Sequence, residues 1–203
     1  MMLVLTLLCR DEADILESML RFHLAQGVDR IIATDNGSVD GSLEILQRFE
    51  RRGQLTLLQE AEQTHDQAVW VTRMARMAAA MGADWVINSD ADEFWWPQQG
   101  SLHSTLAQLP ESVEGLLVER TNFLPPVRNS RDQRPFYQQQ TLRERVSRNS
   151  LGRPLPPKLI HRAHPDIEIT DGNHGALLDG KPITAIKSAS IEILHVPVRS
   201  YKQ

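Results

Sequence analysis

The sequence is poor in cysteine, in aromatic residues and in uninterrupted apolar runs. Among 203 residues it has one cysteine, Cys9, and only 5% are aromatic. A single cysteine cannot form an internal disulfide, so nothing ties the chain to an oxidising compartment, and we expect it to be cytoplasmic. No segment approaches the roughly 18 consecutive apolar residues that span a bilayer. We therefore expect no integral membrane segment, and any membrane contact would be peripheral.

The chain also lacks an excess of positive charge. Its formal net charge is -4 and its pI is near 6.0. Proteins that bind nucleic acid without specificity take their affinity from a basic surface, so we expect no nucleic-acid partner. A negatively charged substrate would need a local cationic site or a metal. With 41% hydrophobic residues, the length suits one domain over residues 1–203.

The first half alternates between apolar strands and amphipathic helices. Glycine and Asp/Asn-rich turns separate them, Gly27 ends the first helix, and Asp11 or Asp14 is placed to cap it. The expected strands are 1–8, 30–34, 54–58 and one that starts near Asp84 and leads into Asp90; the expected helices run from Ile15 to Gly27, through the apolar positions Leu43 to Phe49, and over 66–81. Strand and helix repeated three times before a fourth strand predict an α/β fold, with a Rossmann-like, mostly parallel sheet flanked by helices.

The second half is less regular. Residues 115–120 predict one strand, and residues 124–157 predict a long loop rich in Pro, Arg, Gln and Ser. Short strands are expected again within 158–161, 166–169 and 190–195. We therefore expect a mixed, largely extended C-terminal half, residues 98–203, packed on residues 1–97.

Three acidic residues follow the fourth apolar strand. In a strand, side chains alternate between faces, so Asp90 and Asp92 would point the same way, about 7 Å apart along the backbone. Ligands of open α/β sheets bind at the carboxyl ends of strands, and the loops that start at Arg10, Asp35 and Asp90 all fall there. Two carboxylates at that edge suit Mn²⁺ or Mg²⁺ holding a diphosphate. The alternative is a polar turn.

Four segments together resemble the family-2-like glycosyltransferases of the GT-A fold. They are Arg10 to Asp14, Asp35 to Gly41, Asp90 to Phe94 (Asp-Ala-Asp-Glu-Phe), and His195 to Ser200. Each motif is short, but their order and spacing match over nearly the whole chain, most closely over residues 3–97. The resemblance implies a GT-A fold and transfer of a sugar from a nucleotide-diphospho-sugar, with a UDP-sugar favoured, to a glycan, lipid or protein acceptor.

The resemblance also implies roles for particular residues. The metal would be held by Asp90, Asp92 and His195, with Asp92 as the direct ligand and Asp90 reaching the ribose or a metal-bound water. The remaining donor contacts would come from the first two loops, the Asp-x-Asp element and the third helix: Arg10, Asp11, Glu12, Asp35, Asn36, Arg73, Asp90 and Ala91. Asp11 departs from the Asn that is more usual in the family.

Several of these residues have a plainer explanation. Asp35 either binds the nucleoside or closes an Asx-turn, and the two roles are compatible. Arg10 either contacts phosphate or pairs with a neighbouring carboxylate. Arg73 either lies near the nucleotide or on a solvated helix face. A histidine at a strand end, such as His195, is often structural rather than a ligand.

The catalytic base is the least determined role. Inverting transfer needs a group that takes the proton of the acceptor hydroxyl, and the Glu-Asp pair that serves many family-2 members is absent. The available acids of the second half are Glu119, Asp166, Glu168 and Asp171, of which Asp171, Glu119 and Asp166 are the candidates. Asp171 is favoured because Gly172 and Gly175 let the backbone approach a substrate. A retaining mechanism stays open. So do a nucleotidyltransferase and a catalytically silent GT-A-like domain that binds a glycan or a partner protein.

Overall fold

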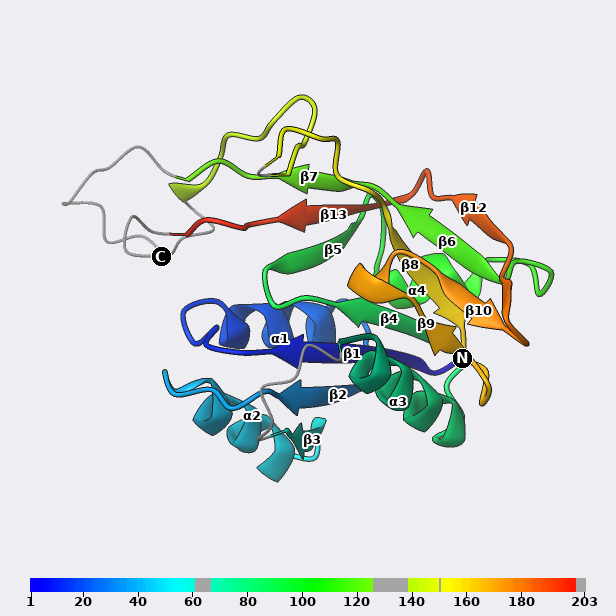
Figure 1. Cartoon of the computed structure of the whole chain (residues 1–203), viewed down its shortest axis with the longest axis horizontal. Helices are drawn as coiled ribbons and strands as arrows, with labels where there is room; N and C mark the ends of the chain where they lie inside the picture. The colour runs from blue at the N-terminus through cyan, green and yellow to red at the C-terminus, as the bar shows by residue number, and fades with distance from the viewer. Residues whose placement is uncertain (61–66, 126–138, 150, 200–203) are drawn as a thin grey trace.

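The structure, a computed structural model, describes residues 1–60, 67–125, 139–149 and 151–199. Its centre is a seven-stranded sheet with the order β12-β6-β8-β4-β1-β2-β3 (Figure 1). The strands are β1 (Leu3–Cys9), β2 (Arg30–Asp35), β3 (Leu55–Gln59), β4 (Trp85–Ser89), β6 (Gly115–Val118), β8 (Lys158–Arg162) and β12 (Ala185–Lys187). Neighbours from β3 to β4 run parallel, as do β12 and β6, whereas β8 is antiparallel to both β4 and β6.

Helices cover both faces of this sheet (Figure 1). They are α1 (Leu16–Ala25), α2 (Ser42–Arg51), α3 (Gln67–Ala80) and α4 (Leu102–Ala107). Side chains of β1 alternate between two cores, because Leu5 packs with α1 and α2 whereas Val4 packs with α3. The predicted mostly parallel α/β sheet is therefore confirmed. No helix in the described ranges has the length and apolar character needed to cross a membrane.

Two three-stranded sheets complete the fold. One has the order β5-β13-β7, and the other has the order β11-β10-β9. Their strands are β5 (Glu93–Pro97), β7 (Arg120–Asn122), β9 (Glu168–Ile169), β10 (Ala176–Leu178), β11 (Lys181–Pro182) and β13 (Ile191–His195), and the 3-10 turn η1 (Asp171–Asn173) lies between β9 and β10. The second half is thus mixed and largely extended in its described residues, as expected.

Local expectations fail at three places. β4 ends at Ser89, so Asp90 follows the strand and Asp92 lies in the turn before β5; strand alternation does not align them. The strand predicted over 115–120 is two strands, separated at Glu119. The first helix has no side-chain cap, because both candidate caps bond elsewhere: Asp11 accepts from Val39 N, and Asp14 accepts from Arg199. The loop predicted over 124–157 lies partly outside the described residues.

The strand register brings distant segments to one edge of the sheet. Cys9 at the end of β1 pairs with Asp35 at the end of β2, and β4 ends beside them. Because β8 runs antiparallel to β4, its first residue, Lys158, lies at the same edge. Next to it, β13 pairs His195 with Glu93 of β5 and with Asn122 of β7. Chemical groups from both the central sheet and the sheet β5-β13-β7 therefore meet here.

Candidate functional site

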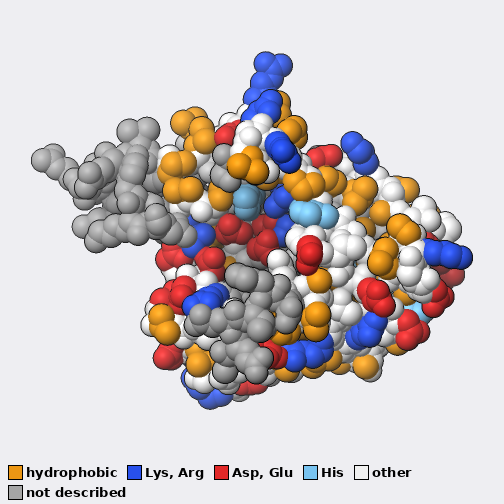
Figure 2. Space-filling model, in the orientation of Figure 1, with side chains coloured by type: hydrophobic (Ala, Val, Ile, Leu, Met, Phe, Trp, Pro, Cys, Tyr) orange, Lys and Arg blue, Asp and Glu red, His pale blue; other side chains and the backbone are white. Residues whose placement is uncertain are grey.

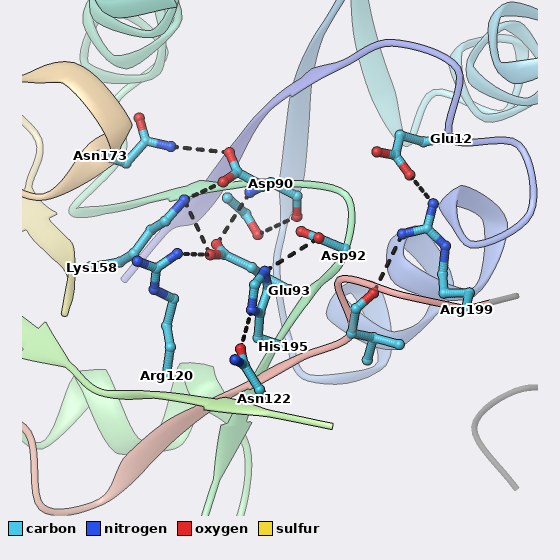
Figure 3. A network of polar contacts seen from close by, with 12 residues as sticks. Glu12, Asp90, Asp92, Glu93, Arg120, Asn122, Lys158, Asn173, His195 and Arg199 are labelled. Atoms are coloured by element: carbon cyan, nitrogen blue, oxygen red, sulfur yellow. Dashed lines mark hydrogen bonds and ion pairs between the residues drawn. The ribbon is translucent and has the colours of Figure 1, made fainter. Parts of the chain in front are cut away.

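A cluster of carboxylates lies at this edge, in the turn that joins β4 to β5. Asp90 and Asp92 are partly exposed, and Glu93 is completely buried. Figure 2 shows acidic side chains gathered near the middle of this face, with cationic and histidine side chains beside them. The close-up in Figure 3 shows that Lys158, Arg120 and His195 point into the cluster. The cluster thus brings three negative groups and several cationic groups into one small volume.

Lys158 is the centre of the charge compensation. Its ammonium group bonds Asp90 Oδ2 and lies 3.1 Å from Glu93 Oε1, while only 1% of its side chain is exposed (Figure 3). Arg120 adds a second cation 3.5 Å from the same Glu93 oxygen, and it also donates to the carbonyl of Pro156. Burying a charge is costly unless it is paired, so these four groups are stable only together.

Burial and charge shift the pKa values in this cluster in opposing ways. For Lys158, burial alone would lower the pKa, but Glu93 and Asp90 outweigh it and the pKa lies above its ordinary value. For Glu93, burial raises the pKa to about 7, with the attraction of Lys158 opposing it. Lys158 is therefore a permanent cation beside Asp90.

Asp92 and His195 form the second part of the site. Asp92 Oδ2 lies 3.3 Å from His195 Nε2, and the other ring nitrogen lies 2.7 Å from Asn122 Oδ1. The Asn122 amide is oriented by its own Nδ2, which donates to Glu144 Oε2 at 2.9 Å and to the Arg148 carbonyl at 3.0 Å. Since Asn122 presents an acceptor, His195 Nδ1 carries the hydrogen.

This tautomer has a direct consequence at the other end of the ring. A neutral His195 directs an Nε2 lone pair at the Asp92 carboxylate, and two acceptors 3.3 Å apart need a positive charge between them. That charge is either a second ring proton or a cation. Burial raises the pKa of Asp92, but His195, Arg199 and Lys158 outweigh it, so the net pKa lies below its ordinary value. The carboxylate is ionised and suited to a cation.

The donor set fits a divalent ion that shares its coordination with a ligand. Carboxylate oxygen and imidazole nitrogen both bind Mn²⁺, and a hydrogen bond from the other ring nitrogen, such as the one from His195 to Asn122, commonly fixes the orientation of a ligating ring. Within the ranges the structure describes, no three Asp, Glu, His or Cys side chains gather closely enough to hold an ion alone. The protein would supply Asp92 and His195, and phosphate oxygens and water would supply the rest.

Hydrogen bonds join the loop that follows β1 to the loop that follows β2 at the carboxyl edge of the sheet. Asp11 N donates to Ser38 Oγ at 3.1 Å, and Asp11 Oδ1 accepts from Val39 N at 2.7 Å. Two further bonds join the loops: Glu12 N donates to Ser42 Oγ, and Ala13 N donates to Asp40 Oδ2. Asp11 has a positive φ of 54°, which short polar residues tolerate best. The loops that start at Arg10 and Asp35, both expected to bind the donor, are therefore joined into one wall.

Asp35 ends β2 inside this wall. It is 2% exposed, and its Oδ2 accepts from Ser38 N at 3.2 Å, which is the Asx-turn that the sequence suggested. Its Oδ1 is buried, and no described residue donates a hydrogen bond to it. A buried acceptor without a donor is unfavourable, so this atom is a ready position for a donor from a bound molecule. Asn36, next to it, donates from Nδ2 to the carbonyl of Glu60.

The C-terminal segment lies across the first loop. Arg199 donates to Asp14 at 2.8 Å, and its side chain is only 4% exposed. It also pairs with Glu12 Oε2 (Figure 3). Burial raises the pKa of Glu12 to about 7, with Arg199 opposing the rise. Glu12 is thus engaged with the segment after β13, and it is close enough to Asp92 for their charges to interact.

Two arginines that were expected near the donor, Arg10 at the phosphate and Arg73 at the nucleotide, are paired with carboxylates at the surface. Arg10 lies 3.8 Å from Asp11, and Arg73 of α3 lies 2.6 Å from Glu60. Both guanidinium groups are more than two-fifths exposed, as the plainer explanations expected. Ala91, also expected at the donor, is buried in the turn between Asp90 and Asp92.

The three candidate acids occupy different places. Glu119 pairs with Lys187 at 3.6 Å, and Asp166 lies 4.0 Å from His164; both are exposed. Asp171 is also exposed, but it begins η1, which reaches the site because Asn173 Nδ2 lies 3.5 Å from Asp90 Oδ1. Asp171 and Glu119 thus both lie in segments that contact the carboxylate cluster, because Arg120 follows Glu119 and lies 3.5 Å from Glu93 Oε1.

The sequence analysis did not identify Lys158, Glu93 and Arg120 as members of the site. The available signal was a lysine at the start of an apolar strand, directly after Pro156 and Pro157. Lysine is rarely buried without a partner, so Lys158 in a strand otherwise made of core residues indicated a buried anion. That signal does not name the anion, because Asp90 is 68 residues away in the sequence.

Of the two tryptophans after the carboxylates, one belongs to the core. Trp95 is 0% exposed, and its indole nitrogen donates to Ser89 Oγ at 2.9 Å. Trp96 is 45% exposed and stacks on Phe22.

Solved structures of similar fold include TarS from S. aureus. The chain matches the structure of TarS residues 1–349 in complex with UDP-GlcNAc with a TM-score of 0.62 and 14% identity, covering 98% of this chain and 60% of that one. The complex with UDP gives a TM-score of 0.60 and 13% identity, covering 97% of this chain. The chain thus spans 60% of the length of those TarS chains, and identities this low show a shared fold alone. A comparison with curated proteins finds no match.

A family assignment comes from the sequence itself. The model of glycosyltransferase family 92 matches residues 10–174, which include the Asp-Ala-Asp-Glu turn, Lys158 and η1 but end before His195. The predicted glycosyltransferase relationship and GT-A-type fold are supported, with family 92 in place of the family-2 likeness. The chain belongs to glycosyltransferase family 92.

Proposed function

We propose that this protein is a metal-dependent glycosyltransferase that uses a nucleotide-diphospho-sugar, with UDP as the nucleotide. The observation that carries the proposal is the pair of Asp92 and His195, whose oxygen and nitrogen face each other at 3.3 Å at the carboxyl edge of the sheet. Family membership supports the reaction class, and the TarS complexes with UDP and UDP-GlcNAc support the choice of donor.

Residues 1–97 would bind the donor. Asp35 Oδ1 would accept a hydrogen bond from the nucleoside, because it is buried without a described donor. Asp90, fixed by Lys158, would reach the ribose or a metal-bound water rather than replace Asp92 as the direct ligand. The wall built from Asp11, Glu12 and Asn36 would border the donor.

The diphosphate would lie beside Asp92 and His195. Mn²⁺ or Mg²⁺ held there would stabilise the negative charge that develops on the leaving diphosphate. Lys158 is a fixed cation beside Asp90, and it would add to the positive potential felt by the leaving group. Residues 98–203 would then face the acceptor, and Asp171, which begins the turn that reaches Asp90 through Asn173, would be one acidic candidate for the base.

The test is calorimetric binding of UDP with and without Mn²⁺. Wild type should bind UDP more tightly with the metal, and Asp92→Asn should lose that gain while retaining a weak, metal-independent affinity. Asp179→Asn, in the exposed turn between β10 and β11, is the control for loss of one carboxylate, and it should behave as wild type. A metal gain that survives in Asp92→Asn would remove this residue from the metal site.

A second measurement separates an enzyme from a silent domain. A panel of UDP- and GDP-sugars is incubated with the protein and Mn²⁺, and the released nucleotide is measured. Slow hydrolysis of one donor, absent in Asp92→Asn, is the expected result. Binding without cleavage of any donor would instead favour a non-catalytic role for the fold.

A further inference from the structure

His174 lies beside the cluster formed by Asp90, Glu93 and Lys158. It directly follows η1, whose Asn173 reaches Asp90 Oδ1 at 3.5 Å. His174 Nδ1 lies 2.8 Å from the carbonyl oxygen of Pro157, the residue before Lys158. A carbonyl oxygen only accepts, so Nδ1 carries the hydrogen and, in the neutral ring, Nε2 carries a lone pair. The ring is thus fixed in one tautomer by the same segment that places Lys158.

The Nε2 edge of this ring is left uncovered by a glycine. No described residue makes a hydrogen bond to His174 Nε2, and the residue is of intermediate exposure. A Cβ atom added to Gly172 would lie 2.7 Å from Nε2 and 2.8 Å from Cδ2, closer than real contacts allow. Any other residue at 172 would therefore press on the nitrogen that has the lone pair.

Burial, together with two nearby cations, favours the neutral form of His174. Burial lowers the pKa of His174, and Arg120 and Lys158 lower it further, while the bond to Pro157 and the charge of Asp90 oppose them. A general base must be unprotonated at the working pH and must have a free lone pair. Among the groups near Asp90 in the described structure, His174 meets both conditions with an orientation already fixed.

We propose that His174 is the general base that activates the acceptor hydroxyl, an inference that rests on the proposed glycosyltransferase function. The acceptor oxygen forms the new bond to the anomeric carbon, and Nε2 takes the proton that this oxygen loses. The bond from the anomeric carbon to the diphosphate oxygen breaks, and its electron pair leaves with the nucleotide. A single displacement of this kind inverts the anomeric configuration. Asp171 is the competing base in the same turn.

The experiment replaces His174 and then supplies an acceptor that reacts without a general base. In His174→Asn the amide can still donate to Pro157, but the Nε2 position is empty. Hydrolysis of UDP-GlcNAc, or of the donor found in the panel, should fall by about 10²- to 10⁴-fold. Azide attacks without losing a proton, so it should restore nucleotide release in the variant and yield an inverted glycosyl azide. UDP affinity in the presence of Mn²⁺ should stay at the wild-type value.

Two glycine variants give an independent test. Gly172→Ala presses on Nε2, whereas Gly180→Ala introduces a Cβ at nearly the same backbone angle, φ of 71° against 70°, with nothing within 4 Å. Both carry the same backbone strain. Gly172→Ala should therefore lose hydrolysis that azide restores, and Gly180→Ala should not. If His174→Asn fails to fold, the two glycine variants still test whether His174 is the general base.

Other outcomes overturn the proposal. Wild-type hydrolysis in His174→Asn excludes the base role, and so does a loss that azide cannot restore. An azide-restored loss in Asp171→Asn, with His174→Asn unaffected, would assign the role to Asp171. In each of these cases UDP binding and donor cleavage by wild type leave the proposed function standing. Wild type that cleaves no donor overturns both.

Discussion

Lys158 Nζ lies 3.1 Å from Glu93 Oε1, and the two side chains are 1% and 0% exposed. The lysine comes from β8 and the glutamate from β5, so their pairing connects the central sheet to the smaller sheet that carries His195. Asp90 shares the same ammonium group. This one cation therefore fixes both the first carboxylate of the Asp-x-Asp turn and the strand that follows it.

Replacing Lys158 by Met should strongly destabilise the protein. The change leaves Asp90 and Glu93 next to each other, and within the described residues Arg120, which pairs with Glu93, is the ion-pair partner that remains. Breaking a buried pair from one side typically costs about 3–5 kcal/mol in the free energy of unfolding. Urea denaturation at pH 7.5 measures this cost.

Two comparisons make the Lys158 prediction specific. Adding Glu93→Gln to Lys158→Met should recover part of the loss, since it removes one of the stranded charges. Lys187→Met, whose side chain is 80% exposed and pairs with Glu119, should change stability by no more than about 0.5 kcal/mol. Equal effects of the two lysine variants would contradict the assigned role of Lys158.

Much of the central sheet and its helices could be predicted from the sequence, because the patterns that predict them lie within single segments. Apolar periodicity is read within one segment, so it predicted β1 to β4 and their helices. The carboxyl ends of parallel strands share an edge, so it also predicted that Asp35 and the Asp90 turn lie at the same edge.

What the sequence did not predict depends on pairing between distant segments. β5, β7 and β13 form a sheet from strands separated by up to about a hundred residues, and their register alone brings His195 to Asn122. Lys158 meets Asp90 because β8 enters antiparallel next to β4, which no local pattern encodes. The alternation expected for Asp90 and Asp92 failed because β4 ends at Ser89, before both residues.

Asn122→Leu should weaken metal binding without touching the proposed ligands. The amide oxygen of Asn122 accepts from His195 Nδ1 at 2.7 Å, and this bond sets which ring nitrogen faces Asp92. Loss of such an outer partner typically costs about 10- to 100-fold in metal affinity. Titration of Mn²⁺ in the presence of UDP, followed by the signal of free Mn²⁺ in electron paramagnetic resonance, measures the change.

The control for Asn122 is its neighbour in β7. Thr121→Val also removes a polar group from this strand, but the Thr121 hydroxyl bonds Glu192 rather than the His195 ring. Its metal affinity should match wild type. If both variants weaken Mn²⁺ binding equally, the effect comes from general loosening of the strand and not from the tautomer of His195.

Asp35→Ala should weaken UDP binding in the presence and in the absence of metal. The unpartnered Oδ1 of Asp35 is the acceptor proposed for the nucleoside, and a hydrogen bond to a charged group is worth about 1.5–3 kcal/mol. We therefore expect a drop in UDP affinity of roughly 10- to 100-fold by calorimetry. The Mn²⁺ dependence should persist, because Asp92 and His195 remain.

Asp29→Ala controls for damage to β2. Asp29 precedes the strand and accepts from Leu3 N at 2.8 Å at the opposite edge of the sheet. This variant should lower stability but leave the affinity for UDP unchanged. A loss of UDP affinity in Asp29→Ala that matches that of Asp35→Ala would show that strand integrity, and not the Oδ1 acceptor, governs binding.

His23 gives a stability prediction that is independent of the site. Its Nδ1 donates to the Met19 carbonyl at 2.9 Å, and its Nε2 accepts from Trp95 N at 3.2 Å. Both ring nitrogens are used in the neutral form, so a second proton would point at another N–H. Burial lowers the pKa of His23 to about 4, and the ring is 0% exposed.

The sign of the pH dependence follows from linkage. An unfolded histidine titrates near pH 6.5, so between that value and about pH 4 the unfolded chain binds a proton that folded His23 does not. The contribution of His23 is thus present above pH 6.5 and is lost as the pH falls through 4. Buried His161 acts in the same direction, whereas Glu12 and Glu93, whose pKa values are raised, act in the opposite one.

Because these groups oppose one another, the measurable quantity is the difference between wild type and His23→Gln. The variant should be less stable at pH 7, since it loses the bonds to Met19 and Trp95. Its deficit should shrink by roughly 2 kcal/mol between pH 7 and pH 5, because only wild type has a buried ring that resists protonation. Urea unfolding at several pH values gives the difference, with surface His164→Gln as the control. A deficit that is the same at both pH values would mean that folded His23 accepts a proton as readily as the unfolded chain does.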